Sequence, residues 1–163
     1  MHVLSWLGPL SILSLRPFPV QAYVKLRVNG ESKHRSIVCP KTLNPQWQFD
    51  SSFHVVAGSM EEREGDVALE VYDRDHLSGN EFLGMVQFRT SDLLRRATVA
   101  AYFDLLNKDQ TDKTRGELCV IATHGEDKLE PDERAEILDD LQRQLKAKIN
   151  KGKEMKKAAT TSG

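Results

Sequence analysis

Hydrophobic and polar residues alternate with a period of two from about Ala22 to Thr123. In the segment VALEVY at residues 67–72, for example, the odd-numbered positions fall on one face of an extended chain and the even-numbered positions on the other. Turn residues interrupt the alternation about every ten positions, which is typical of an antiparallel sandwich or barrel. The pattern predicts strands at residues 22–28, 33–39, 47–55, 67–72, 82–88, 101–106 and 116–122.

The apolar positions of these strands predict one hydrophobic core, and the residues between them predict turns. Asn29-Gly30 has the composition of a tight hairpin turn, so the strands on either side of it should pair. A short helical turn is possible at residues 90–96. We expect the core to contain Trp47, Phe49, Phe53, Leu69, Val71, Phe88, Phe103, Leu105, Leu118 and Val120.

After Gly125 the period changes to that of a helix. Pro131 suits a first helical position, and an apolar stripe follows, which predicts an amphipathic helix near residues 131–150. Charge is segregated: eight acids and two bases from 126 to 142 give −6, and seven bases and one acid from 143 to 163 give +6. Such a helix is compatible with a solvated element docked by one stripe, with a protein-binding seam, or with an anionic membrane contact. The stripe consists of Ile137, Leu138, Leu141, Leu145 and Ile149.

The first twenty residues fit three descriptions. Residues 3–15 are nearly uncharged, and Val20-Gln21-Ala22 resembles a signal-peptide cleavage site. Against a signal peptide, no Lys or Arg precedes Arg16 and Gly8-Pro9 breaks the run, which favours a strand or irregular cover for the core, with disorder as the third alternative. The run is too short for a transmembrane helix. We divide the chain into an apolar segment (1–21), a β domain (22–124) and a charged helix with a basic tail (125–163).

Composition narrows the classes of function. The 163 residues include 24 acids and 23 bases, so overall basicity gives no argument for nucleic-acid binding. Cys39 and Cys119 lie in apolar stretches without metal-ligand spacing, which favours buried, reduced thiols and a cytoplasmic location. The sequence contains no HExxH, GxSxG, P-loop or Gly-rich dinucleotide motif, so we do not expect an enzyme.

Ordered motifs show a family resemblance. AYVKLRV at 22–28, KTLNPQW at 41–47, VYDRDHLSGNEFLG at 71–84 and GELCVI at 116–121 together resemble a C2 domain, the calcium- and lipid-binding module of protein kinase C and the synaptotagmins. The resemblance covers about residues 21–123 and implies an eight-stranded antiparallel β-sandwich that binds membranes peripherally. The family's first strand should lie within residues 1–20, where its pattern is not recognisable. Either residues 10–15 supply a substitute strand, or a sheet edge stays uncovered.

An acidic loop forms the first candidate site. Asp73, Asp75 and Glu81 leave a strand together, and their carboxylates could converge on Ca²⁺, a hard cation that prefers oxygen ligands. The resemblance implies that further acids come from another loop, but Gln21 stands where the family has Asp, and residues 1–30 contain no Asp or Glu. Calcium affinity rises with the number of charged ligands, so we expect weak or absent calcium binding against the alternative of a solvated acidic turn.

A basic hairpin forms the second candidate site. Lys25 and Arg27 alternate on one strand, and Lys33 and Arg35 on the next, so four cations can share one face and attract phosphate. The resemblance implies a phosphoinositide or phosphatidylserine site here. His76 beside Leu77, at the tip of the acidic loop, fits a membrane-facing or solvent-exposed position better than a catalytic base. The alternative for these four cations is an ordinary solvated strand face. The alternative function is a calcium-independent adaptor that binds a protein partner through the sandwich and the C-terminal helix. The predicted lipid-binding residues are Tyr23, Lys25, Arg27, Lys33, Arg35, Tyr72, His76 and Leu77.

Overall fold

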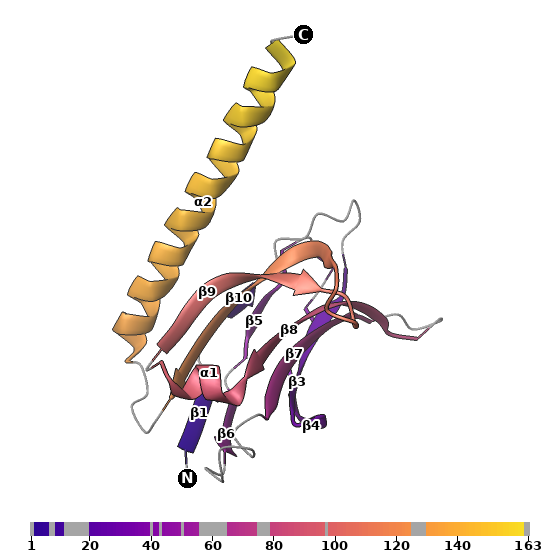
Figure 1. Cartoon of the computed structure of the whole chain (residues 1–163), viewed down its shortest axis with the longest axis vertical. Coiled ribbons are helices and arrows are strands. Elements are labelled where there is room, and N and C mark those ends of the chain that lie inside the picture. The colour runs from indigo at the N-terminus through magenta and orange to yellow at the C-terminus, as the bar shows by residue number, and fades with distance from the viewer. Residues whose placement is uncertain are drawn as a thin grey trace. The chain divides into compact units, whose positions relative to one another are not determined.

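A computed structural model gives the fold of the chain (Figure 1). It describes residues 2–6, 9–11, 20–39, 41–42, 44–49, 51–55, 65–74, 79–96, 98–124 and 130–161. The chain forms two compact units, residues 1–128 and 129–163, and each is described separately below.

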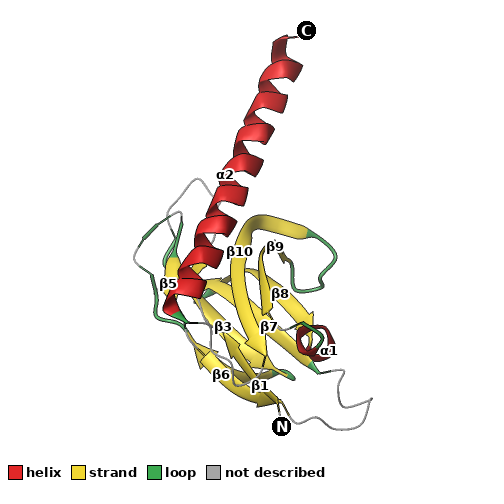
Figure 2. Ribbon diagram, turned by 90° about the vertical axis from the view of Figure 1, so that its left-hand side faces the viewer, coloured by secondary structure: helices red, strands yellow, loops and turns green. Residues whose placement is uncertain are grey.

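The first unit is an antiparallel β-sandwich. Its strands follow the order β4-β3-β7-β8-β9-β10-β1-β6, with β2 and β5 as a separate pair. β8 and β9 pair only where Met85 lies opposite Leu106. The strands on either side of this pair therefore belong to two layers. Figure 2 shows β9 and β10 crossing in front of β3, β7 and β8. The elements are β1 (His2–Trp6), β2 (Pro9–Ser11), β3 (Ala22–Val28), β4 (Glu31–Arg35), β5 (Gln46–Gln48), β6 (Ser51–Val55), β7 (Asp66–Asp73), β8 (Glu81–Arg89), α1 (Thr90–Leu94), β9 (Thr98–Leu106) and β10 (Lys113–His124).

One hydrophobic core lies between the layers. Eight of the ten predicted core residues are buried, and Phe88 and Phe103 are partly buried against the same cluster. Their rings meet edge to face, with centroids 5.0 Å apart. The indole Nε1 of Trp47 donates a buried hydrogen bond of 2.9 Å to the Ala22 carbonyl, which ties β5 to β3. The core also contains apolar residues of β3 that were not among the predicted ones: Ala22, Val24, Leu26 and Val28.

Gly84 permits the close approach of the two layers. Its φ of +152° is rarely adopted by L side chains, and a Cβ there would lie 2.7 Å from the Leu105 Cβ and 2.7 Å from the Thr114 Oγ1. The β7–β8 register shifts between Val71 and Tyr72, the first of which lies opposite Gly84. A bulge and a glycine therefore lie where β8 passes against β9.

One predicted strand is shifted along the chain and one is divided, and β9 and β10 begin three residues earlier than predicted. The strand predicted at 33–39 corresponds to β4, which ends at Arg35, because the Ser36 hydroxyl accepts the Val24 N–H at 2.8 Å and replaces a ladder bond. The strand predicted at 47–55 is divided into β5 and β6. Their partners β2 and β1 are divided at the same place while the register continues, with Trp6 opposite Ser51 and Pro9 opposite Gln48.

The N-terminal residues form strands. β1 lies between β10 and β6 and pairs antiparallel with both, and β2 pairs with β5. The strand alternative is therefore confirmed for His2–Trp6 and Pro9–Ser11. Of the substitute strand predicted at residues 10–15, residues 10 and 11 lie in β2, and the remainder lies outside the described residues. The position of β1 is set by pairing with the edges of β6 and β10. It does not follow from a hydrophobic period within β1 itself.

The second unit contains one helix, α2 (Pro131–Thr161). It extends past residue 150, where the predicted helix ended, because the following sequence KGKEMKKAA is rich in Lys, Glu, Met and Ala and contains a single glycine. Its first turn carries Asp132 and Glu133, which suit the positive end of the helix dipole. Within the described residues, no helix is both long and apolar enough to span a bilayer.

Candidate functional site

The outer face of β3 carries the predicted cations. Residues of β3 alternate between the core and this face, so that Tyr23, Lys25 and Arg27 point away from the core cluster. The Asn29-Gly30 turn, with φ of +51° and +77°, returns the chain into β4 and brings Arg35 opposite Lys25. We use the name basic face for the outer surface of β3, β4 and β7 that contains Tyr23, Lys25, Arg27, Lys33, Arg35, Glu70 and Tyr72.

The register places Lys33 differently from the other three cations. The β3–β4 pairing shifts between Leu26 and Arg27, so Ser32, not Lys33, lies opposite Arg27. Lys33 instead forms an exposed ion pair with Glu31, with 2.6 Å between Nζ and Oε2. Lys33 lowers the pKa of Glu31 through a hydrogen bond and its charge. Glu31 therefore neutralises the charge of Lys33, one of the four predicted cations.

Aromatic rings hold two cations in place. The Arg35 guanidinium lies 4.0 Å from the ring centroid of Tyr23, and the Lys25 ammonium lies 4.6 Å from that of Tyr72. Tyr23 and Tyr72 stack with centroids 5.5 Å apart, and Tyr72 meets Phe82 edge to face at 5.5 Å. The rings form a row across β3, β7 and β8, which orders the charged groups above it.

Tyr23 has an unsatisfied polar group. Its side chain is completely buried, yet its hydroxyl lacks a hydrogen-bond partner among the described residues. A buried hydroxyl without a partner is costly and requires an explanation. The hydroxyl belongs to the ring that lies under the Arg35 guanidinium.

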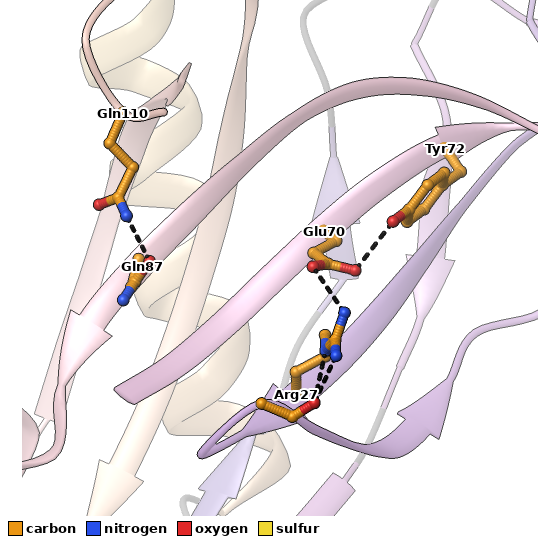
Figure 3. A network of polar contacts seen from close by, with 6 residues as sticks. Arg27, Glu70, Tyr72, Gln87 and Gln110 are labelled. Atoms are coloured by element: carbon orange, nitrogen blue, oxygen red, sulfur yellow. Dashed lines mark hydrogen bonds and ion pairs between the residues drawn. The ribbon is translucent and has the colours of Figure 1, made fainter. Parts of the chain in front are cut away.

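Glu70 is an acid within the basic face that the sequence pattern did not single out. It lies on β7 opposite Lys25, and its side chain is 13% exposed. Oε1 lies 3.3 Å from the Arg27 Nη1, and Oε2 accepts the Tyr72 hydroxyl at 3.0 Å (Figure 3). Arg27 also donates to the carbonyl of Gly30. The signal was present in the alternation of VALEVY, which puts residue 70 on the same outer face as Tyr72.

The environment of Tyr72 keeps its hydroxyl protonated. Burial, followed by the hydrogen bond and the charge of Glu70, raises the pKa of Tyr72 to about 12. At neutral pH this hydroxyl is therefore a donor, and its proton is directed to the carboxylate.

The acidic loop is described only at its two ends. Asp73 ends β7, and its Oδ1 accepts a hydrogen bond of 2.8 Å from the backbone N–H of Gln21. Glu81 begins β8 opposite Asp73, whereas Asp75, His76 and Leu77 lie outside the described residues. Within the described part of the chain, no three His, Cys, Asp or Glu side chains group so that they could hold a metal ion.

Both cysteines are buried and unpaired, as predicted. Burial raises the pKa of Cys119 to about 11, and it also raises that of Cys39, whose thiol donates to the Gln46 carbonyl. These thiols act as small hydrophobic groups of the sandwich.

The family model of the C2 domain matches residues 14–105, more than half of the chain. The chain belongs to the C2 domain family. A stretch of 76 residues, 47% of this C2 domain chain, is 40% identical to part of Multiple C2 and transmembrane domain-containing protein 1 from Rattus norvegicus and from Homo sapiens. The chain spans about 8% of the length of the rat protein and 7% of the human one.

Solved structures confirm the predicted fold. A C2 domain of plant Extended Synaptotagmin 1 superposes with a TM-score of 0.60 at 21% identity, covering 78% of this chain and 96% of that one. A calcium-bound pair of C2 domains from Extended-Synaptotagmin 2 gives 0.61 at 17% identity, over 76% of this chain and 45% of that one. The resemblance predicted from the four motifs and the antiparallel C2 sandwich are therefore both confirmed.

Proposed function

We propose that this C2 domain binds the anionic phospholipids of a membrane through its basic face, at the cytoplasmic surface and without catalysis. The observation that carries the proposal is the arrangement of Arg35 and Lys25 over the rings of Tyr23 and Tyr72. Cations ordered on an aromatic row lose less side-chain entropy on binding than cations that extend freely into solvent. The face therefore presents preorganised donors for phosphate oxygens.

Two cations of this face are available to a ligand. Among the described residues, neither Lys25 nor Arg35 has a carboxylate within ion-pair distance, whereas Arg27 pairs with Glu70 and Lys33 with Glu31. The guanidinium of Arg35 can take two phosphate oxygens at once. Phosphoinositide and phosphatidylserine headgroups supply such oxygens.

Calcium should contribute little to this binding. Asp73 has one oxygen committed to the Gln21 N–H, and Gln21 stands where the family supplies an acid. A site built from Asp73, Asp75 and Glu81 alone would lack the first-loop carboxylates and fall at or beyond the roughly millimolar end of the affinity range. We therefore assign membrane attraction to the basic face, with calcium as a weak cofactor at most.

The affinity expected from this face is modest. Each cation near an anionic surface contributes about 1 kcal/mol, so the two unpaired cations together give only about 2 kcal/mol. The cationic half of α2, residues 143–161 with net charge +6, offers a second attraction to an anionic membrane. Binding should weaken as salt is added, because the exposed charges are screened.

Co-sedimentation with vesicles tests the proposal. Full-length protein is mixed with phosphatidylcholine vesicles that contain phosphatidylserine or phosphatidylinositol 4,5-bisphosphate, with calcium or with chelator. Neutralising the four cations of the basic face with Gln should remove most of the binding, whereas neutralising four exposed cations elsewhere in the sandwich should not. The first variant changes Lys25, Arg27, Lys33 and Arg35, and the matched control changes Arg89, Arg95, Arg96 and Lys113.

The same experiment separates the membrane proposal from the alternative. Binding that resists neutralisation of the basic face but disappears with chelator would assign the membrane contact to the acidic loop. No binding to either vesicle under any condition would favour a protein-binding adaptor, in which the sandwich and α2 contact a partner instead of lipid.

A further inference from the structure

The apolar stripe of α2 is only partly buried. Among its described side chains, Leu141 is buried, whereas Ile137, Leu138 and Leu145 keep part of their surface exposed. Helix propensity alone is marginal in water, and a helix gains most of its stability by packing an apolar face against another surface. The exposed part of the stripe is therefore a surface on which a partner can pack.

Four of the five stripe residues are symmetric about Arg143. Leu141 and Leu145 stand two positions before and after it, and Ile137 and Ile149 stand six positions before and after it. Each step of four residues turns an α-helix by about 40°, so these four positions follow one face of α2, and position 143 falls on the opposite side. Two antiparallel copies of α2 that are level at this position bring the leucines of one copy opposite the leucines of the other, and the isoleucines opposite the isoleucines.

The charges of α2 follow the same symmetry with opposite sign. Residues 126–142 carry −6 and residues 143–161 carry +6, so antiparallel pairing sets acids against bases, whereas parallel pairing would set acids against acids. Glu133 and Lys153 stand ten positions before and after Arg143, at the edges of the stripe, where ion pairs set the orientation of paired helices. The like-charged Asp132 and Glu154 stand eleven positions from Arg143, but on the side of the helix opposite the stripe.

From this symmetry we propose that α2 is a dimerisation element that pairs antiparallel with α2 of a second copy of this chain. The partner of the stripe is thus another copy, and the opposite charges of the two halves of α2 select it and set its direction. The inference concerns the second unit and does not depend on the membrane function proposed above. A dimer joins two sandwiches, so any surface that one sandwich offers is present twice.

Sedimentation equilibrium of the full chain measures the self-association. We expect a species of about twice the mass of one chain at high protein concentration, which dissociates on dilution. Added salt should raise the dissociation constant, because the charges that flank the stripe are screened. A single species with the mass of one chain at every concentration would overturn the proposal.

Charge reversal tests the direction and register of the pair. E133K and K153E each place like charges opposite one another twice in the dimer, so each variant alone should associate at least about tenfold more weakly than the wild type. An equimolar mixture of the two should form heterodimers, because the substituted position 133 of one chain faces the substituted position 153 of the other. Glu133 also accepts the backbone N–H of Glu130, and mixing cannot repair the loss of that contact within one chain. A mixture that associates no better than either variant alone would overturn the antiparallel pairing.

A second pair of variants tests the apolar contact. Leu145→Gln removes an apolar side chain from the centre of the pair, once in each copy, and should raise the dissociation constant more than about tenfold. Ala147→Gln is the matched control: Ala147 is exposed and lies off the stripe, so the same new side chain should change the dissociation constant less than about twofold. If Leu145→Gln lowers the free energy of unfolding but leaves the dissociation constant unchanged, the stripe serves the fold of one chain and the proposal is refuted. An equal loss of association in both variants would also refute it, because the contact would then not lie along the stripe.

Discussion

The backbone N–H of Gln21 donates a hydrogen bond of 2.8 Å to Oδ1 of Asp73, fifty-two positions later in the chain. The next residue, Arg74, donates its own N–H to the Gln21 carbonyl at 2.9 Å. Gln21 thus lies beside the start of the acidic loop, at a position where the resemblance to calcium-binding relatives implies an acid. Its backbone donor uses part of the coordinating capacity of Asp73 and fixes the end of β7.

This contact predicts the result of removing charge from the acidic loop. The double substitution Asp73→Asn with Asp75→Asn should change vesicle binding by less than about twofold, because the new side-chain amide at position 73 can still accept the Gln21 N–H through its oxygen and the basic face is unchanged. Calcium titration by calorimetry should give no more than the roughly millimolar affinity expected of an incomplete ligand set, and the double variant should abolish that. Vesicle binding that depends on micromolar calcium would contradict the expectation.

The neighbouring contact between Tyr72 and Glu70 predicts a late phenol titration. Burial first and the Glu70 hydrogen bond second raise the pKa of Tyr72 to about 12 from its ordinary value of 10.0. The folded state favours the protonated phenol, so this contribution to stability is complete below about pH 10 and is lost as the pH rises from about 10 to about 12. The phenolate absorbance of the wild type minus that of Tyr72→Phe should rise near pH 12.

The dependence of the free energy of unfolding on pH checks the same sign. Wild-type protein should lose more stability between about pH 10 and about pH 12 than Tyr72→Phe, measured by denaturant unfolding at several pH values in this interval. The variant Glu70→Gln should lower the pKa of Tyr72 toward its ordinary value, since it removes the neighbouring charge. Identical titration curves for the wild type and Tyr72→Phe would show that Tyr72 ionises outside the expected range.

Gly84 predicts a position in the sandwich that does not tolerate a side chain. In Gly84→Ala the new Cβ would meet the Leu105 Cβ and the Thr114 Oγ1, each at 2.7 Å, at a φ of +152°. Overpacking and backbone strain should together cost about 3 kcal/mol of unfolding free energy. Gly30→Ala is the matched control: its φ is +77°, but a Cβ there meets no atom within 4 Å, so the cost should be about 1 kcal/mol. Equal destabilisation of the two variants would argue against close contact of the layers at Gly84.

Features of the fold that depend on local residues could be predicted from the sequence. The Asn29-Gly30 turn follows from two residues that tolerate positive φ, and the burial of Leu69 and Val71 follows from the alternation of β7. The N-terminal strands could not be predicted this way. His2–Trp6 lacks a clear period of two, and its place is set by distant partner strands, β6 and β10.

The candidate site shows the same division. Alternation placed Lys25 and Arg27 on one face, but it could not reveal that a register shift removes Lys33 from the position opposite Arg27. It also marked residue 70 as outward-facing without showing that its carboxylate reaches Arg27 and Tyr72. Register and side-chain direction across three strands decide which charges meet, and neither is encoded in the period of one strand.

The central position of β1 predicts that its backbone donors are required for the fold. Ser5 lies opposite both Thr123 of β10 and Ser52 of β6, so it is in the interior of the sheet. Proline at this position removes an N–H from the ladder and should cost about 3 kcal/mol or more of unfolding free energy, which is a large part of the stability of a domain of this size. Ser5→Ala keeps the N–H and should stay within about 1 kcal/mol of the wild type.

Denaturant unfolding of the two variants measures the difference in the free energy of unfolding. Amide exchange should show loss of protection in β6 for Ser5→Pro, because β1 is the strand beside β6. Equal stability of Ser5→Pro and Ser5→Ala would mean that β1 does not contribute to the sheet, and the first strand of this C2 domain would then have to lie elsewhere in the chain.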